Sequence, residues 1–165
     1  MNSIQIALCS FLLKEILTMW KEFIVSLTAD NQYVKPNAPA TIEQVQEVEN
    51  KLEVILQKDI KDLLFELNGD SDLILSTQQI IDYNLMTRKM MMYDIDEDDY
   101  QPVDHYLFVA GDGCGDYYGY EITDDGIKDD NIYMWNHEGT DVNCNFIKVA
   151  NNLKELIELR YTNRI

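Results

Sequence analysis

The sequence predicts an α+β fold, in which a mainly antiparallel, twisted sheet is flanked by helices. Apolar residues in the first half recur at steps of three and four, which is the spacing of one helix face. In the second half, short apolar runs are separated by turns rich in Gly and Asp, which is typical of β-hairpins. A final helical segment follows. Helices, then a meander of strands, then a helix favour α+β, and 165 residues favour a single globular domain.

The N-terminal part is predicted to be helical. An apolar stripe predicts an amphipathic helix over 1–28, of which 1–18 is a candidate extension, because residues 19–21 also resemble a chain start. A loop with two prolines spans 29–40. Three further helices are expected: 41–56, opened by the capping box Thr41-Ile-Glu-Gln44; 60–67, closed by Asn68-Gly69; and 77–92, capped by Ser76 or Thr77.

The second half is predicted to form the sheet. Leu73-Ile74-Leu75 is a short buried strand that precedes it. Four more strands are expected at 106–110, 117–122, 132–135 and 146–149. The turn 111–116 and the hairpin signal Asp124-Asp-Gly126 connect the first three of these. Asn151 is predicted to cap the final helix, and no internal repeat is present.

The chain is strongly acidic, with 13 basic and 30 acidic residues and a net charge of −17. Segment 94–141 contains fifteen of the acids and one base, Lys128. Such a charge repels phosphate backbones and anionic membranes, so nucleic-acid binding and membrane binding are not expected. Two interpretations stay open for this segment: a solvated face that keeps the protein soluble, or a face that attracts a basic protein partner.

The cysteine pattern and the hydropathy point to a cytoplasmic protein. Cys9, Cys114 and Cys144 are too few and too scattered for a disulfide framework, which suits a reducing compartment. The apolar run at 4–13 lacks a preceding Lys or Arg and a small-residue cleavage site, so no signal peptide is expected. No apolar run reaches the length of a membrane span.

Motifs for metal binding are incomplete. Asp94-x-Asp96-x-Asp98 resembles the start of a calcium-binding EF-hand loop, but Asp99 stands where that loop needs Gly, and His105 where it needs Glu. The four candidate zinc ligands lack a closely spaced pair: Cys114, His137, Glu138 and Cys144. We therefore expect no metal and no cofactor.

Catalytic motifs are also weak. The turn Gly111-Asp-Gly-Cys-Gly-Asp116 has two carboxylates and no base, so it would repel phosphate; its glycines are interpreted as turn residues. Cys114 lies between the carboxylates Asp112 and Asp116, which disfavour a reactive thiolate. We therefore expect a protein that is not an enzyme.

Several segments follow one another in an order and spacing that are typical of a known family: the helix 41–56 with Glu49, Asp59 to Leu67 with Asn68-Gly69, Leu75-Ser76, Leu107-Phe108-Val109-Ala110, Gly115-Asp116, Tyr120, Trp135-Asn136-His137-Glu138 and the helix after Val149-Ala150. In these segments the chain resembles the SUKH superfamily, the cell-wall-assembly-regulator and killer-toxin-resistance family. The SUKH-like domain is placed at 41–162. This chain departs from the family at Leu56-Gln57, where the family usually has Leu-Pro.

The resemblance implies a binding protein without fixed catalytic residues. Its bacterial members look like immunity proteins that neutralise toxins, often nucleases, and its fungal members like interaction hubs. Together with the charge, this predicts that a basic partner contacts an acidic and aromatic face. The expected contact residues are Asp94, Asp96, Asp98, Asp99, Asp112, Asp116, Tyr117, Tyr118, Trp135, His137 and Glu138. The alternative is a regulatory module without a toxin; the protein itself is expected to be a monomer or a homodimer.

Overall fold

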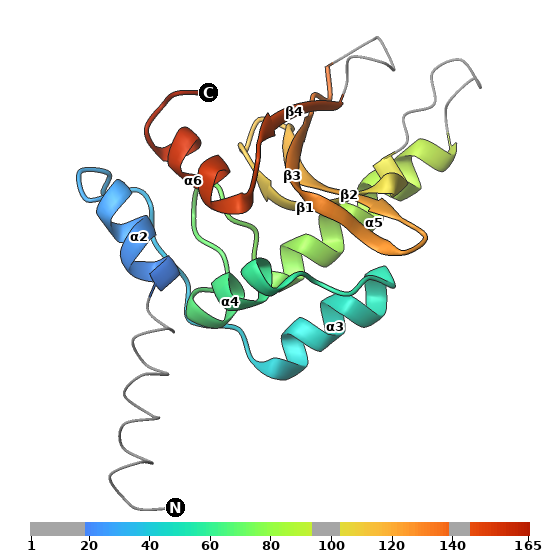
Figure 1. Ribbon diagram of the computed structural model, residues 1–165, viewed down its shortest axis with the longest axis horizontal. Helices are drawn as coiled ribbons and strands as arrows, with labels where there is room; N and C mark the ends of the chain where they lie inside the picture. Colours follow the sequence, from blue (N-terminus) through green and yellow to red (C-terminus); the bar gives the residue numbers. More distant parts are fainter. Residues whose placement is uncertain (1–18, 94–102, 139–145) are drawn as a thin grey trace, which may run out of the picture.

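The computed structural model describes residues 19–93, 103–138 and 146–165 (Figure 1). Five α-helices, one 3-10 helix and a four-stranded sheet lie in these ranges, which confirms the predicted α+β class. In chain order the elements are α2 (Met19–Leu27), α3 (Ile42–Leu52), α4 (Lys58–Glu66), α5 (Thr77–Tyr93), η2 (Val103–His105), β1 (Tyr106–Gly111), β2 (Tyr117–Thr123), β3 (Gly126–Trp135), β4 (Phe146–Ala150) and α6 (Leu153–Tyr161). Among these described helices, none is long and apolar enough to cross a bilayer.

Local capping interactions open two of the helices. At α3 the predicted box is present: the Thr41 hydroxyl accepts a hydrogen bond from the Gln44 N–H, and the Gln44 side chain accepts one from the Thr41 N–H. Ser76 and Gln79 make the same reciprocal exchange before α5, at 2.9 and 3.3 Å. Both boxes satisfy backbone donors that have no partner inside the helix.

The break between α3 and α4 comes earlier than predicted. Instead of continuing to residue 56, α3 ends at Leu52, and Glu53 adopts a left-handed conformation with φ 54°. The Glu49 carboxylate accepts a hydrogen bond from the Leu56 N–H at 2.9 Å, and it pairs with Lys61 at 2.7 Å. A side chain from α3 thus organises the connection to α4.

Two helix caps differ from the prediction by one or two residues. The C-cap of α4 is Leu67 rather than Asn68-Gly69, because the Asn68 side chain instead accepts from the Thr77 N–H at 2.7 Å, at the start of α5. The N-cap of α6 is Asn152 rather than Asn151, which donates its own N–H to Glu155.

The sheet is an antiparallel meander with the order β1-β2-β3-β4. The predicted hairpin joins β2 to β3, and β3 starts earlier than predicted because Gly126 already pairs with Thr123. The short strand predicted at 73–75 is a single antiparallel bridge, from Ile74 to Ala110, on the outer edge of β1. This edge is also held by α5: Asn84, fully buried, bonds both the N–H and the C=O of Phe108 at 2.9 Å.

The main core lies between one face of the sheet and a ring of helices. Helix α6 packs against β3, β4 and α2; α2 packs on α4, α4 on α3, α3 on α5, and α5 on β1, which closes the ring (Figure 1). Leu107, Tyr120 and Ile132 belong to this core. Phe108 and Trp135 belong to a second, aromatic cluster with Val103. Because strand side chains alternate between faces, one meander supplies both clusters.

Candidate interaction surface

The loop between β1 and β2 is a tight turn built around Asp112. Its carboxylate accepts hydrogen bonds from the N–H groups of Cys114 at 2.8 Å and Asp116 at 3.2 Å. Gly113 and Gly115 have φ values of +76° and +117°, which glycine adopts at little cost. The predicted interpretation of these glycines as turn residues is therefore confirmed, and Asp112 serves the backbone of its own loop.

The end of β3 is fixed to this loop by an ion pair. The Asp116 carboxylate accepts from the His137 N–H at 3.1 Å and lies 2.8 Å from the ring nitrogen Nδ1 of His137. This hydrogen bond is the main reason why the pKa of His137 is raised above its usual value. The imidazole lies over Gly115, where an added Cβ would come within 2.9 Å of the ring. Only glycine leaves room for this closure.

An aromatic stack lies behind the loop. Tyr117 stacks on Trp135 with ring centroids 6.0 Å apart and an angle of 9°, and it contacts Tyr83 of α5 at 5.4 Å. The pKa of Tyr117 is raised, mainly by burial and further by Tyr83 and Asp112. Tyr83 and Asp112 thus disfavour a negative charge on the Tyr117 hydroxyl.

A hollow of about 520 Å³ lies between this loop and the segment before α5. It is lined by Asp70, Ser71, Asp72, Leu73, Ile74, Leu75, Gln79, Tyr83, Gly111, Gly113, Cys114, Gly115 and Tyr117. Asp70, Asp72 and Tyr83 were not among the contact residues predicted from the sequence. The sequence does mark Gly69-Asp70-Ser71-Asp72 as a polar turn between two apolar runs. Because this turn is about 40 residues away from Gly111 in the sequence, its position beside the β1–β2 loop could not be predicted.

Asp70 organises the wall of this hollow. Its buried carboxylate accepts hydrogen bonds from the N–H groups of Asp72, Leu73 and Ile74 at 2.8–3.1 Å, and from the hydroxyl of Tyr161 in α6. Burial, with a further contribution from Asp70, raises the pKa of Tyr161 above its usual value. The wall is thus rigid, and Asp72 is left exposed at its rim.

Comparison with known protein families shows to which family this chain belongs. The model of the SMI1 / KNR4 family (SUKH-1) matches residues 39–159. The chain belongs to this family. No match is found among curated proteins. Membership in SUKH-1 is consistent with an immunity role or a regulatory protein-interaction role. The match includes the loop, the hollow and the aromatic stack.

Within this SUKH-1 domain, the predicted contact residues separate into three groups. Asp94, Asp96, Asp98 and Asp99 lie outside the described residues. The structure gathers Asp112, Asp116, Tyr117, His137 and Glu138 around the β1–β2 loop and the end of β3. The third group, Tyr118 and Trp135, lies in the interior.

Tyr118 and Trp135 differ from the prediction because strand geometry buries them. Tyr118 is 2% exposed and belongs to the main core, with the Arg160 guanidinium 5.2 Å from its ring. Trp135 is 6% exposed and packs against Phe108 and Tyr117. Neither side chain presents the open surface that contact with a partner would need.

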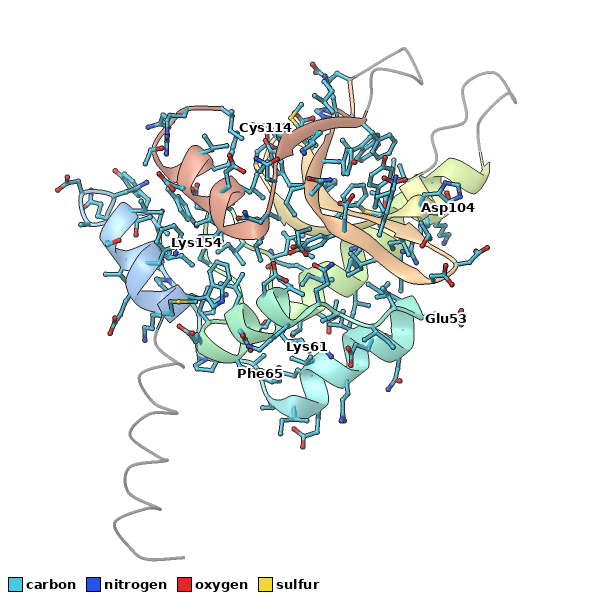
Figure 2. All side chains as sticks on the ribbon, in the orientation of Figure 1. Glu53, Lys61, Phe65, Asp104, Cys114 and Lys154 are labelled. Carbon is cyan, nitrogen blue, oxygen red and sulfur yellow. The ribbon has the colours of Figure 1, made fainter. Side chains whose placement is uncertain are left out.

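The carboxylates of the acidic segment that the structure describes, within residues 103–138, do not all lie on one face. Asp130 lines a hollow of about 640 Å³ with Asp59 and Asp62. Asp104 lines another, of about 470 Å³, with Glu121 and Asp124. Figure 2 shows Asp104 well apart from Cys114, which marks the β1–β2 loop. The described carboxylates of this segment are therefore distributed over at least three separate places: the β1–β2 loop and these two hollows.

No group of three or more candidate metal ligands occurs among the described residues. Cys144 and the carboxylates of 94–99 were parts of the two metal motifs considered from the sequence, and they lie outside the described ranges. Cys114 is exposed at the loop.

Proposed function

We propose that the chain is a non-enzymatic immunity protein, which binds and neutralises a basic protein toxin in the cytoplasm of a bacterial cell. A nuclease fits best as the toxin, because a nuclease needs a positively charged cleft for its phosphate substrate. An acidic protein can occupy such a cleft in place of the nucleic acid.

The observation that carries this proposal is the charge around the sheet. Residues 103–138 contain nine carboxylates and one lysine, and none of the nine is buried. Lys128 pairs with Glu121 at 2.8 Å, so most of the negative charge in this segment is not neutralised by a nearby lysine or arginine of the same segment. A field of this kind accelerates association with a positively charged partner and discriminates against acidic ones.

Binding without catalysis is supported by what the polar groups of the loop do. Asp112 bonds the backbone of its own turn, Asp116 holds His137, and Asp70 holds the adjacent wall. Each carboxylate stabilises the shape of the surface. A pre-formed surface costs little conformational entropy on binding, which favours affinity.

The first experiment is capture of partners by the tagged full-length chain from its native cell, with elution in rising salt. We expect one basic protein, released by salt, that kills or inhibits cells when it is produced without this chain. Several partners that are indifferent to salt would instead indicate the regulatory interaction module. If no basic toxin encoded near this gene is neutralised by the chain, the immunity proposal is wrong.

A charge reversal tests the steering. Glu138→Lys changes an exposed carboxylate beside the loop, and we expect the association rate to fall severalfold at low salt, with a smaller change in dissociation. Glu22→Lys makes the same charge change at an exposed position of α2, and it should have a clearly smaller effect. Equal effects of both variants would show that only the net charge matters.

A further inference from the structure

The hollow between the β1–β2 loop and the 70–75 segment has the size and walls of a site for one side chain or small ligand. Its volume of about 520 Å³ falls in the usual range of ligand sites, ~300–1,000 Å³. Three of its lining residues are glycines, which place no side chains into the space. The wall is held by the hydrogen bonds of Asp70, and the loop by those of Asp112. The site is therefore formed before any ligand arrives.

The chemistry of the lining favours a cation. No Lys or Arg is among the described residues that line it, whereas Asp70, Asp72, Tyr83 and Tyr117 are. The Asp70 carboxylate is used by the backbone and by Tyr161. Among the described residues, no hydrogen bond or ion pair engages the exposed carboxylate of Asp72.

The aromatic rings favour a planar cation. Tyr83 and Tyr117 line the same hollow, with ring centroids 5.4 Å apart and an angle of 43° between the rings. A guanidinium group is flat, remains charged at every physiological pH, stacks on aromatic rings and forms paired hydrogen bonds with a carboxylate. A lysine ammonium has the charge but neither the plane nor the fork of donors.

We propose that this hollow is a receptor for an arginine side chain of the partner, with Asp72 as the ion-pair acceptor and Tyr83 and Tyr117 as the stacking surface. The inference rests on the proposed function, since a basic partner supplies the arginine. In this proposal the arginine site holds the bound partner in place, whereas the overall charge only increases the rate of association.

The test uses the full-length chain labelled with ¹⁵N and the peptide acetyl-Gly-Arg-Gly-amide. The probe should shift the amide signals of the three lining glycines, Gly111, Gly113 and Gly115, and leave that of Gly126 in the β2–β3 hairpin unchanged. Replacing the arginine of the peptide by citrulline, which keeps the shape and removes the charge, should weaken binding about tenfold. Replacing it by lysine should also weaken binding, but by a smaller factor.

Substitutions separate the site from general electrostatics. Asp72→Asn removes an exposed carboxylate with no structural bond, so the fold is retained, and we expect peptide affinity to fall about five- to tenfold. Asp125→Asn makes the same change at the exposed hairpin, outside the hollow, and should leave the affinity within twofold. Tyr83→Leu should also weaken binding, with its folding checked by the unchanged Gly126 signal.

Three results would overturn the inference: no shift at the lining glycines, equal binding of the citrulline or lysine peptide, or equal effects of Asp72→Asn and Asp125→Asn. Its failure is distinguishable from failure of the proposed function. If Asp72→Asn still neutralises the captured toxin with unchanged affinity, the immunity proposal stands without this anchor. If the arginine peptide binds but the chain neutralises no basic toxin, the site stands and the toxin assignment falls.

Discussion

Asn84 offers the sharpest test of how the fold positions the candidate surface. It is 0% exposed, and its amide acts as a neighbouring strand would: Nδ2 donates to the Phe108 carbonyl at 2.9 Å, and Oδ1 accepts from the Phe108 N–H at 2.9 Å. Nδ2 also donates to the Ile80 carbonyl at 2.7 Å. These bonds fix α5 against β1, and therefore Tyr83 against Tyr117.

The variant Asn84→Leu keeps the approximate size and removes these bonds. It leaves the N–H and the C=O of Phe108, a fully buried residue, without their partner. Each orphaned group costs about 1–3 kcal/mol, so we expect the free energy of unfolding to fall by about 4 kcal/mol. For a domain of this size that corresponds to about 8–16 °C in melting temperature. Such a loss is a large share of the ~5–15 kcal/mol that natural domains have.

The assay is urea unfolding followed by the fluorescence of the buried Trp20 and Trp135. Gln78→Leu on the exposed side of α5 is the matched control, and it should cost less than about 0.5 kcal/mol, because its bond to Asp82 is exposed. If Asn84→Leu lowered the free energy of unfolding by less than about 1 kcal/mol, with an unchanged dependence of that free energy on urea concentration, the Asn84 amide would not replace a strand partner.

Two further predictions concern the loops. Asp116→Asn should lower the pKa of His137, measured by NMR titration, because the carboxylate raises it in the fold. The pKa of His137 is higher in the folded domain than in the unfolded chain, so its pair with Asp116 stabilises the domain fully below about pH 6.5. This contribution disappears as the pH rises through the raised pKa. If the stability of the Asp116→Asn variant had the same pH dependence as that of the parent chain, this argument would be wrong. Gly69 and Gly113 have nearly equal φ values, +78° and +76°, but an added Cβ would lie 2.5 Å from a backbone nitrogen at Gly69 and meet nothing within 4 Å at Gly113. Gly113→Ala should therefore lower the free energy of unfolding by about 1–2 kcal/mol, because alanine is strained in the left-handed conformation. Gly69→Ala should lower it by at least about 1–3 kcal/mol more, because of the clash. Equal urea midpoints of the two variants would show that the clash contributes nothing.

Elements governed by near neighbours in the chain could be predicted from the sequence. The capping box of Thr41 and Gln44 joins residues that are three positions apart, and the Asp124-Asp-Gly126 turn joins strands that are consecutive in the chain. Both can therefore be recognised as short sequence patterns. Helix ends were less accurate where a distant partner intervened. Asn68, for example, bonds Thr77 instead of closing α4.

The candidate surface was only partly predictable. The glycine-rich turn and its acids were found, because their composition marks a tight loop on its own. The opposite wall, with Asp70, Asp72 and Tyr83, was missed, since it is brought to the loop by contacts between residues far apart in the sequence, such as the bridge from Ile74 to Ala110 and the bonds of Asn84.

The sequence by itself determined the fold class, the family resemblance and the acidic balance, because periodicity, turn residues and charge are properties of neighbouring or summed residues. The tertiary structure decided which of these residues face outward. Tyr117 and Tyr118 are adjacent in the chain, yet one lines the hollow and the other is 2% exposed in the core. A strand directs successive side chains to opposite faces, and only packing against the helices determines what covers each face.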